Sequence, residues 1–262
     1  MIPPKPRILV TGGETFLGIN VASALLAEGA DVTLLVRPGR EKTLGVLADR
    51  VRWHVADVWD PASLRGRARG HAWVINTVGS MVAEPSSGLT YHRLNVVSAR
   101  NVANMCISDG VSNMLLFSVA GAPWINRQYI RAKREAETYL ARIGLNGVIV
   151  RAPLVYVRGA PRPLFYRLAS GVIGRPPLSW LGLGNWAPLP LDVVARGVAR
   201  LVLRGPTRRI NYAGDLRRLN TRDELRGVAN VPPQVTQGLQ MTAEGALPFD
   251  SIDDNAPFGW TN

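Results

Sequence analysis

The sequence has little cysteine, little histidine and few acidic residues, and each shortage excludes a class of protein. Only one cysteine, Cys106, occurs in 262 residues, so no internal disulfide can form, and a cytoplasmic or equivalent reducing compartment is expected. The three histidines, His54, His71 and His92, are too far apart along the chain to suggest a set of metal ligands. No metal site is therefore expected.

Long hydrophobic runs are also missing. No stretch of about eighteen apolar residues occurs, so no transmembrane helix is predicted. The first residues, Met1 to Pro6, carry no long apolar segment, and no secretory signal peptide is expected. The length of 262 residues suits one large domain, or one domain with a small appendage.

Basic residues outnumber acidic residues by 31 to 19, which gives a formal net charge of +12. Such a charge attracts anions, whether phosphorylated ligands, an anionic membrane surface, nucleic acid or an acidic protein partner. No known nucleic-acid-binding motif is present, so nucleic acid is the least favoured of these partners. A basic solvated surface without a ligand is the alternative interpretation.

The most informative pattern is the glycine-rich segment Thr11–Gly18, which reads TGGETFLG. It follows the apolar run Ile8–Val10 and precedes a helical stretch and a second apolar run, Val32–Arg37. Gly12 would allow a tight turn, Gly18 would let the helix pack closely, and the helix start would face a pyrophosphate. The segment predicts the first half of a dinucleotide-binding unit, or a relic of one that no longer binds.

One position of this turn departs from the usual G-x-x-G-x-x-G spacing. Thr15 stands where the middle glycine is expected. We expect its side chain to hold the backbone further from the pyrophosphate, which is an argument against full enzymatic activity.

Strands and helices continue to alternate after the turn. Further strands are expected over Val51–Val55, Ala72–Asn76, Met114–Ser118 and Val148–Arg151, and helices over Ala62–Arg67, Tyr91–Ser108 and Gln128–Ile143. This alternation predicts an α/β, Rossmann-type doubly wound parallel sheet, with ligands at the carboxyl ends of its strands. The expected organisation is a dinucleotide-binding core over residues 1–158, a small C-terminal lobe over 159–228 and an irregular, acidic, proline-containing tail over 229–262.

The residue that ends the second strand bears on the choice of cofactor. An acidic residue there would bind the ribose 2′-hydroxyl of NAD, whereas Arg37 suits the 2′-phosphate of NADP, and Arg40 follows within reach. NADP(H) is therefore favoured over NAD(H), and an ordinary surface arginine is the alternative. Asp57 is placed to accept a hydrogen bond from the adenine amino group or to cap the next helix, although Asp60 is better placed to cap it.

The segment Tyr129–Lys133 puts a tyrosine and a lysine on the same face of a helix. A cationic lysine lowers the pKa of the phenol, so that it exchanges a proton near neutral pH, and it can also hold ribose hydroxyls. Ser118, at the end of the preceding strand, is positioned to hydrogen-bond a substrate oxygen. These three are the predicted catalytic residues, and an amphipathic helix with a surface tyrosine and lysine is the alternative.

With these motifs in order, the chain resembles the short-chain dehydrogenase/reductase superfamily in its extended or atypical branch. The matching strings are Thr11–Gly18, Ala56–Pro61, Asn95–Val102, Ser118, Tyr129–Lys133, Arg151–Tyr156 and Pro190–Ala195. The resemblance implies that Tyr129 is the general acid/base, that Lys133 tunes it and grips the ribose, and that Ser118 orients the substrate. The cofactor-binding residues that it implies are Gly12, Gly13, Thr15, Phe16, Leu17, Gly18, Arg37, Arg40, Asp57, Val58, Val78, Gly79, Lys133 and, beside the nicotinamide, Pro153.

Two groups of the superfamily are similar to different parts of the chain. Arg151–Tyr156 resembles sugar-nucleotide epimerases and reductases, which implies NADP-linked oxidoreductase or epimerase chemistry. Gln128–Glu137 resembles the nucleotide-binding accessory subunit of respiratory complex I, which implies a redox-inactive, NADPH-binding subunit of a membrane-associated respiratory or photosynthetic complex. The turn is also similar to that of chloroplast stem-loop RNA-binding proteins, and an RNA-binding derivative is the third and least favoured reading.

The uncharged segment 176–190 is rich in proline and glycine and contains Trp180 and Trp186. It predicts an apolar lid over the substrate, or a docking surface for a partner protein or a membrane, with ordinary packing of the small lobe as the alternative. The acidic tail is a second candidate docking segment, through Phe258 and Trp260.

Overall fold

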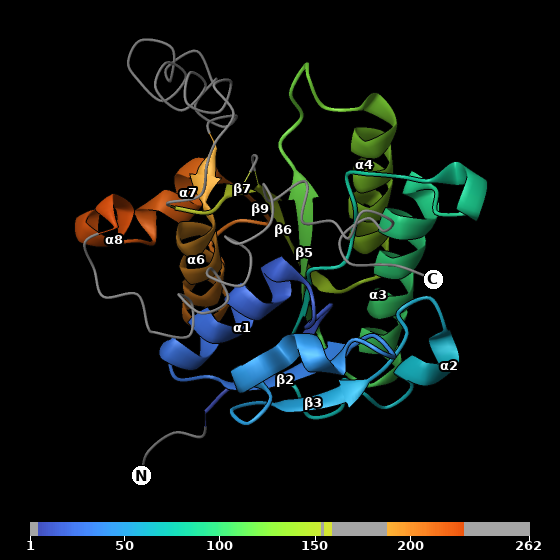
Figure 1. Ribbon diagram of the computed structural model, residues 1–262, viewed down its shortest axis with the longest axis horizontal. Coiled ribbons are helices and arrows are strands. Elements are labelled where there is room, and N and C mark those ends of the chain that lie inside the picture. Colours follow the sequence, from blue (N-terminus) through green and yellow to red (C-terminus); the bar gives the residue numbers. More distant parts are fainter. Residues whose placement is uncertain (1–4, 153–154, 159–187, 228–262) are drawn as a thin grey trace.

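A computed structural model describes residues 5–152, 155–158 and 188–227 of the chain (Figure 1). Pro153, the loop with Trp180 and Trp186, and the acidic tail lie outside the described residues. What the sequence predicts for these segments therefore stays a prediction, as does the division of the chain into core, lobe and tail.

Seven parallel strands form the central sheet of the described chain. They are β1 (Arg7–Thr11), β2 (Asp31–Val36), β3 (Arg52–Val55), β4 (Trp73–Asn76), β5 (Asn113–Val119), β6 (Asn146–Ala152) and β9 (Ile210–Tyr212). Their order across the sheet is β3-β2-β1-β4-β5-β6-β9, and a separate pair joins β7 (Val155–Tyr156) to β8 (Leu189–Pro190). The strand order reverses between β1 and β4, where ligands bind in doubly wound sheets. The predicted Rossmann-type fold is confirmed.

The inner strands form where apolar residues run continuously. Ile8, Leu9 and Val10 of β1 have no exposed surface, since helices cover both faces of a parallel sheet. The strand β3 lies at the edge of the sheet, and all four of its residues are exposed. All six strands that the sequence predicts are present, with shifts of one or two residues at their ends.

Helices cover the sheet on two sides (Figure 1). The α-helices are α1 (Phe16–Ala27), α2 (Pro61–Leu64), α3 (Ser98–Ser108), α4 (Arg127–Arg142), α6 (Leu191–Arg204), α7 (Ala213–Arg218) and α8 (Arg222–Arg226). The described ranges also contain two 3₁₀ helices, η1 (Glu41–Leu47) and η2 (Pro85–Ser87), and a π-helical segment, η3 (Arg93–Val97). One layer contains α1 and α6 and the other contains α3 and α4, so the core has two halves.

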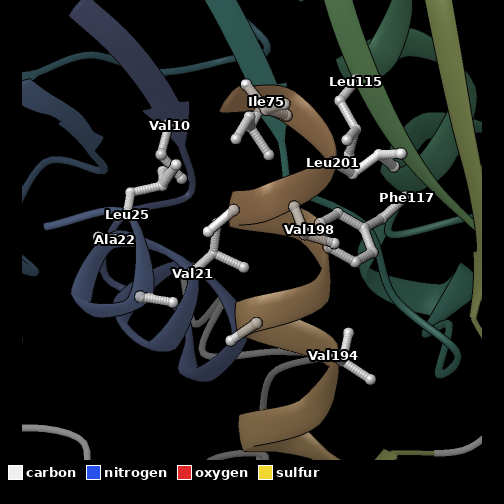
Figure 2. Packing of buried hydrophobic residues seen from close by; sticks show 14 of the residues in the cluster. Val10, Val21, Ala22, Leu25, Ile75, Leu115, Phe117, Val194, Val198 and Leu201 are labelled. Atoms are coloured by element: carbon white, nitrogen blue, oxygen red, sulfur yellow. The ribbon is translucent and has the colours of Figure 1, made fainter. Parts of the chain in front are cut away.

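The first half of the core is built around α6, as Figure 2 shows. Its fully buried Val194 and Val198, together with Leu201, lie between α1 and the strands. From α1 come Val21, Ala22 and Leu25, and from the strands come Val10, Ile75, Leu115 and Phe117. Helix α6 and strand β9 were not predicted as elements, yet together they extend the sheet and cover it.

Two predicted helices differ from the structure. The helix expected over Ala62–Arg67 ends at Leu64, because Gly66 adopts a left-handed φ of +74° that stops it. The helix expected over Tyr91–Ser108 is present, but residues 93–97 within it are π-helical. Such bulges often occur at functional sites, and this one carries Asn95.

None of the helices in the described ranges is both long enough and apolar enough to cross a membrane. The same ranges contain no group of three or more histidine, cysteine, aspartate or glutamate residues that could hold a metal ion.

Candidate dinucleotide site

The glycine turn between β1 and α1 requires glycine at both of its ends. Gly12 has a φ of +71°, and a Cβ atom there would lie 2.9 Å from Val78 Cγ2. A Cβ atom on Gly18 would lie only 2.1 Å from the carbonyl oxygen of Gly12. Helix α1 therefore starts directly against the turn, and a side chain at either position would force the turn and the helix apart.

Gly13 ties the turn to the neighbouring strand. Its N–H donates to the carbonyl oxygen of Leu35 at 2.9 Å, and a Cβ atom on Gly13 would lie 2.7 Å from Leu34 Cβ. This contact fixes the direction in which the next residue, Glu14, leaves the turn.

Thr15 caps helix α1. Its hydroxyl donates to the carbonyl oxygen of Gly12 at 2.7 Å and accepts from the N–H of Gly18 at 3.0 Å. The first N–H groups of a helix lack partners inside it, and Thr15 satisfies one of them, leaving those of Phe16 and Leu17 at the helix start. The threonine therefore keeps the turn closed, but it occupies one donor that a pyrophosphate could otherwise use.

Arg37 and Arg40 follow β2 and lie in a neighbourhood of mixed charge. Burial lowers the pKa of Arg37, and Arg40 lowers it further, while the charges of Asp57 and Glu14 raise it. Arg37 is half-buried, and its contact with a 2′-phosphate stays a prediction. Arg37 and Arg40, which are predicted to hold a 2′-phosphate, thus lie near the carboxylates of Glu14 and Asp57.

Asp57 does not cap helix α2. Its Oδ1 accepts from the N–H of Trp59 at 2.9 Å, whereas Asp60 is the capping residue and accepts from the N–H of Ala62 at 2.9 Å. The neighbouring Val58 is buried, and its carbonyl oxygen accepts from Asn101 Nδ2 at 3.1 Å. The contact of Asp57 with adenine stays a prediction.

Sequence reasoning missed Glu14, which extends from the glycine turn toward Arg37. Its Oε2 atom is buried and has no hydrogen-bond partner in the described part of the chain. Burial raises the pKa of Glu14, and the backbone N–H groups of Glu14 and Arg37 and the charges of Arg37 and Arg40 oppose that rise. The available signal was an acidic residue within a turn expected to face phosphates.

Tyr129 and Lys133 lie at the other end of the site, on α4. Both side chains are buried, so the alternative of a surface pair is wrong. Tyr129 packs with Tyr91, Val119 and Ile125, and the two tyrosine ring centroids are 6.0 Å apart. Lys133 Nζ lies 5.8 Å from the centre of the Tyr129 ring and donates to the carbonyl oxygen of Phe117 at 3.1 Å.

The pKa values at this end differ from what the motif predicts. Burial, reinforced by Tyr91, raises the pKa of Tyr129, and the lysine does not lower it. Burial also lowers the pKa of Lys133 to about 8, although the charge of Glu137 opposes this. The pKa of Tyr129 therefore shifts in the direction opposite to the expected one, because both groups lose solvation together.

The loop after β4 joins the two ends of the site. Val78 is buried against Gly12, and the next residue, Gly79, has a φ of +147°. A Cβ atom on Gly79 would lie 2.5 Å from Lys133 Nζ and 2.6 Å from Asn95 Oδ1. Asn95 holds this loop, since its Oδ1 accepts from the N–H of Ser80 at 3.1 Å and its Nδ2 donates to the Ser80 carbonyl oxygen at 3.0 Å.

The hydroxyl of Ser118 is engaged with a buried ionic cluster. It donates to Glu137 Oε1 at 2.5 Å and accepts from Arg134 Nη1 at 3.2 Å. Arg151 donates to both oxygens of Glu137, at 3.1 Å and 2.6 Å, and to the hydroxyl of Tyr212 at 2.7 Å. The predicted substrate-orienting serine is thus hydrogen-bonded to protein groups that the sequence analysis did not single out.

The Glu137 carboxylate is ionised because of these partners. Burial alone would raise its pKa, but hydrogen bonds from Arg151 and Ser118 and the charges of Arg134 and Arg151 outweigh that effect and hold it below its ordinary value. The cluster links α4 to the ends of β5, β6 and β9.

A family model described as NAD(P)H-binding matches residues 12–161 of the chain. An uncharacterised chloroplastic protein of Arabidopsis thaliana is 28% identical over 171 residues, which cover 60% of this chain and 55% of that protein. The chain thus spans little more than half the length of that relative. D-erythronate dehydrogenase of Cupriavidus necator is 29% identical over 277 residues, with 92% of this chain and 80% of that protein covered.

Solved structures share the fold. The structure of UDP-glucose 4-epimerase from Bifidobacterium longum, determined with NAD+ and UDP, has a TM-score of 0.56 and 17% identity. The match covers 78% of this chain and 76% of the epimerase. At this level of identity, the likeness concerns the fold alone.

Proposed function

Since the chain belongs to the NAD(P)H-binding family, we propose that it is a dinucleotide-dependent oxidoreductase or epimerase of the short-chain dehydrogenase/reductase type. One observation carries the proposal: a continuous path runs from the turn at Gly12 through Val78 and Gly79 to Lys133. Close packing along this path holds the glycine turn and Lys133 at the strand ends, where ligands bind in doubly wound sheets. When bound, the cofactor would supply or accept a hydride at a substrate carbon.

The residues of the chain would bind the cofactor from both ends. The N–H groups of Phe16 and Leu17 at the start of α1 would hold the pyrophosphate, aided by the helix dipole. Lys133, with a pKa of about 8, is mostly protonated at neutral pH and would hold a ribose hydroxyl. Arg37 and Arg40 support a preference for NADP(H) over NAD(H) through the 2′-phosphate.

Tyr129 would give or take the proton at its phenol oxygen. The ammonium group of Lys133 would stabilise the tyrosinate that this transfer forms, and water is excluded because the ring is buried. Ser118 would orient the substrate oxygen after exchanging its hydrogen bond to Glu137 for one to the substrate.

The test replaces Tyr129 with phenylalanine and measures two quantities. Turnover is followed by NADP(H) absorbance with a panel of alcohols, carbonyl compounds and sugar nucleotides, and NADPH affinity by fluorescence titration. We expect turnover to fall by about 10²–10⁴-fold, while the affinity for NADPH stays within about threefold. Tyr139→Phe is the matched control, because Tyr139 lies on the same helix and donates to Asn104 Oδ1 at 2.6 Å, outside the site. Unchanged turnover in Tyr129→Phe would contradict the mechanism.

A second candidate function is a redox-inactive, NADPH-binding subunit of a larger membrane-associated complex. It is favoured by the raised pKa of the buried Tyr129 and by the hydrogen bond that engages Ser118 with Glu137. Docking would then use the loop with Trp180 and Trp186, the acidic tail, or a basic surface against an anionic membrane. Purification from the native source tests it, and recovery only as a free monomer or homodimer counts against it.

A further inference from the structure

Apolar side chains surround the tyrosine that the proposed function uses as its acid/base. Tyr129 packs with three further buried residues between the end of β5 and the start of α4, namely Val119, Ala122 and Ile125. Partly buried apolar residues pack against these four: Met81, Tyr91 and Ile130. We call this group the Tyr129 cluster. The proton transfer uses only the phenol oxygen of Tyr129, so the apolar surroundings of the ring have no role in it.

The last two residues of β5 have different surroundings. The hydroxyl of Ser118 bonds to Glu137 and Arg134, whereas the side chain of Val119 belongs to the Tyr129 cluster. The methyl groups of a valine neither donate nor accept a hydrogen bond. A polar substrate group placed against Val119 would therefore lose its water without gaining a partner, which costs free energy.

Two polar groups next to the cluster are engaged by backbone oxygens. The hydroxyl of Tyr91 donates to the carbonyl oxygen of Met81 at 3.1 Å, and Arg134 Nη2 donates to the carbonyl oxygen of Val119 at 2.9 Å. A hydroxylated substrate would have to compete with these bonds. The surroundings of the Tyr129 ring thus favour apolar substrate groups.

Two exposed apolar residues adjoin the cluster along the chain. Val82 follows Met81 directly and is 42% exposed, and Trp124 precedes Ile125 directly and is 43% exposed. They lie in the segments that follow β4 and β5, at the carboxyl ends of neighbouring strands, where ligands of a doubly wound sheet bind. Ligand sites are lined mostly by apolar and aromatic side chains, and these two would extend such a lining outward from Tyr129.

We infer that the substrate is a ketone, or the matching secondary alcohol, with apolar aryl or alkyl groups on its reacting carbon, and that Val119 is a specificity-determining residue that favours these groups over hydroxylated ones. In the reduction, the ketone carbon accepts a hydride from the reduced dinucleotide. The ketone oxygen accepts the proton of the Tyr129 phenol, which solvent then replaces. The inference rests on the proposed function and names its substrate class, to which sugar nucleotides do not belong.

The experiment measures kcat/KM of the full chain for two ketones, propiophenone and 2-hydroxyacetophenone, with NADPH and with NADH. The two ketones have nearly the same shape and differ by a methyl group in place of a hydroxyl. Val119→Thr makes the same exchange in the protein. We expect the preference for propiophenone to fall by about tenfold in this variant, because the new hydroxyl can bond to that of the substrate. Comparison with the wild type cancels the different intrinsic reactivities of the two ketones.

Val111→Thr is the matched control. Val111 is 3% exposed and Val119 is 4% exposed, but Val111 precedes β5, at the opposite end of that strand. We expect its preference to stay within about twofold of the wild type, since specificity depends on contacts with the substrate.

A second variant covers the case in which Val119→Thr does not fold, as checked by circular dichroism. Val119→Ala shortens the side chain and leaves more room beside the Tyr129 ring. The preference for butyrophenone, which is one methylene longer, over propiophenone should then rise by about tenfold. An unchanged preference would contradict the role of Val119.

The possible results separate this inference from the function on which it rests. A wild-type protein that binds neither NADPH nor NADH overturns the proposed function. A protein that binds one of them and converts UDP-glucose, or reduces neither ketone, overturns the inferred substrate class and leaves dinucleotide binding standing. Equal ketone preferences in the wild type and Val119→Thr overturn the role of Val119, and so does a fall of similar size in Val111→Thr.

Discussion

The two ends of the site each contain a carboxylate with a buried oxygen, and the two are in opposite states. Glu137 bonds to Ser118, Arg134 and Arg151, and its pKa is lowered. Glu14 has a buried Oε2 with no hydrogen-bond partner in the described ranges, and burial raises its pKa. A carboxylate whose oxygens are hydrogen-bonded within the protein stabilises the scaffold, whereas one with an oxygen lacking a partner is available to a ligand.

This difference changes the interpretation of Ser118. At the Glu137 end, three elements of the sheet and α4 meet through ionic contacts that are already complete. Ser118 belongs to that set, so a substrate oxygen would have to replace Glu137 as the partner of its hydroxyl. At the Glu14 end, by contrast, the turn and the end of β2 leave an acceptor unused.

The largest effect on stability should come from removing Glu137, the carboxylate that is hydrogen-bonded within the protein. Glu137→Ala would leave the partly buried charges of Arg151 and Arg134 without their shared partner, and we expect the free energy of unfolding to fall by about 3 kcal/mol. Urea denaturation measures it. Glu135→Ala is the control on the same helix, because Glu135 is exposed and pairs only loosely with His92 at 3.4 Å, so its cost should be below about 0.5 kcal/mol. Equal losses in the two variants would contradict the structural role of Glu137.

A smaller effect is expected at the turn. Thr15→Ala removes the cap of α1 and should cost about 1 kcal/mol of unfolding free energy. Thr15→Ser keeps the hydroxyl that bonds to Gly12 and Gly18 and serves as the control, with a smaller loss. Because Thr15→Ala frees the N–H of Gly18, NADPH affinity should not fall in proportion to stability. A tenfold loss of affinity would show that the hydroxyl itself supports the ligand.

The smallest effects concern how the unfolding free energy depends on pH. Glu14 and Glu137 should contribute slopes of opposite sign. The pKa of Glu14 is raised above 4.5 in the folded protein. Above that pH the native state therefore binds this proton more fully than the unfolded state does, and the unfolding free energy falls as pH rises. The folded pKa of Glu137 is lowered, so its contribution is complete above pH 4.5 and is lost as pH falls further. Urea unfolding between about pH 4 and pH 7 should show that the fall in unfolding free energy caused by Glu14 is absent from Glu14→Gln. The same slope in wild type and variant would contradict the assignment.

Much of the fold could be predicted from local patterns. The alternation of apolar segments with helical stretches located six strands of the sheet, and Gly12 and Gly18 located the turn between β1 and α1. The predicted dinucleotide-binding family is confirmed by the NAD(P)H-binding family match, and the predicted Rossmann-type fold by the strand order and the solved structures that share it. Strand β9 was missed because three residues, Ile210–Tyr212, are too few to show a hydrophobic period.

The site was harder to predict than the fold. The positions of Tyr129 and Lys133 on one helix follow from their spacing, but their burial and its effect on both pKa values do not. Ser118 was expected to face a substrate because it ends a strand, yet Glu137 and Arg134, on the following helix, engage its hydroxyl.

The sequence by itself determined the alternation of strands and helices, the glycine turn and the family, because these depend on local backbone preferences and on the period of apolar residues. Only the tertiary structure decided which charges meet. Glu14, which follows β1, interacts with the charge of Arg37, which follows the adjacent strand β2, and Glu137 of α4 bonds to Arg151 of β6. The free energies of such pairs depend on distance and solvent exclusion, which the order of the strands sets and the spacing of residues along the chain does not.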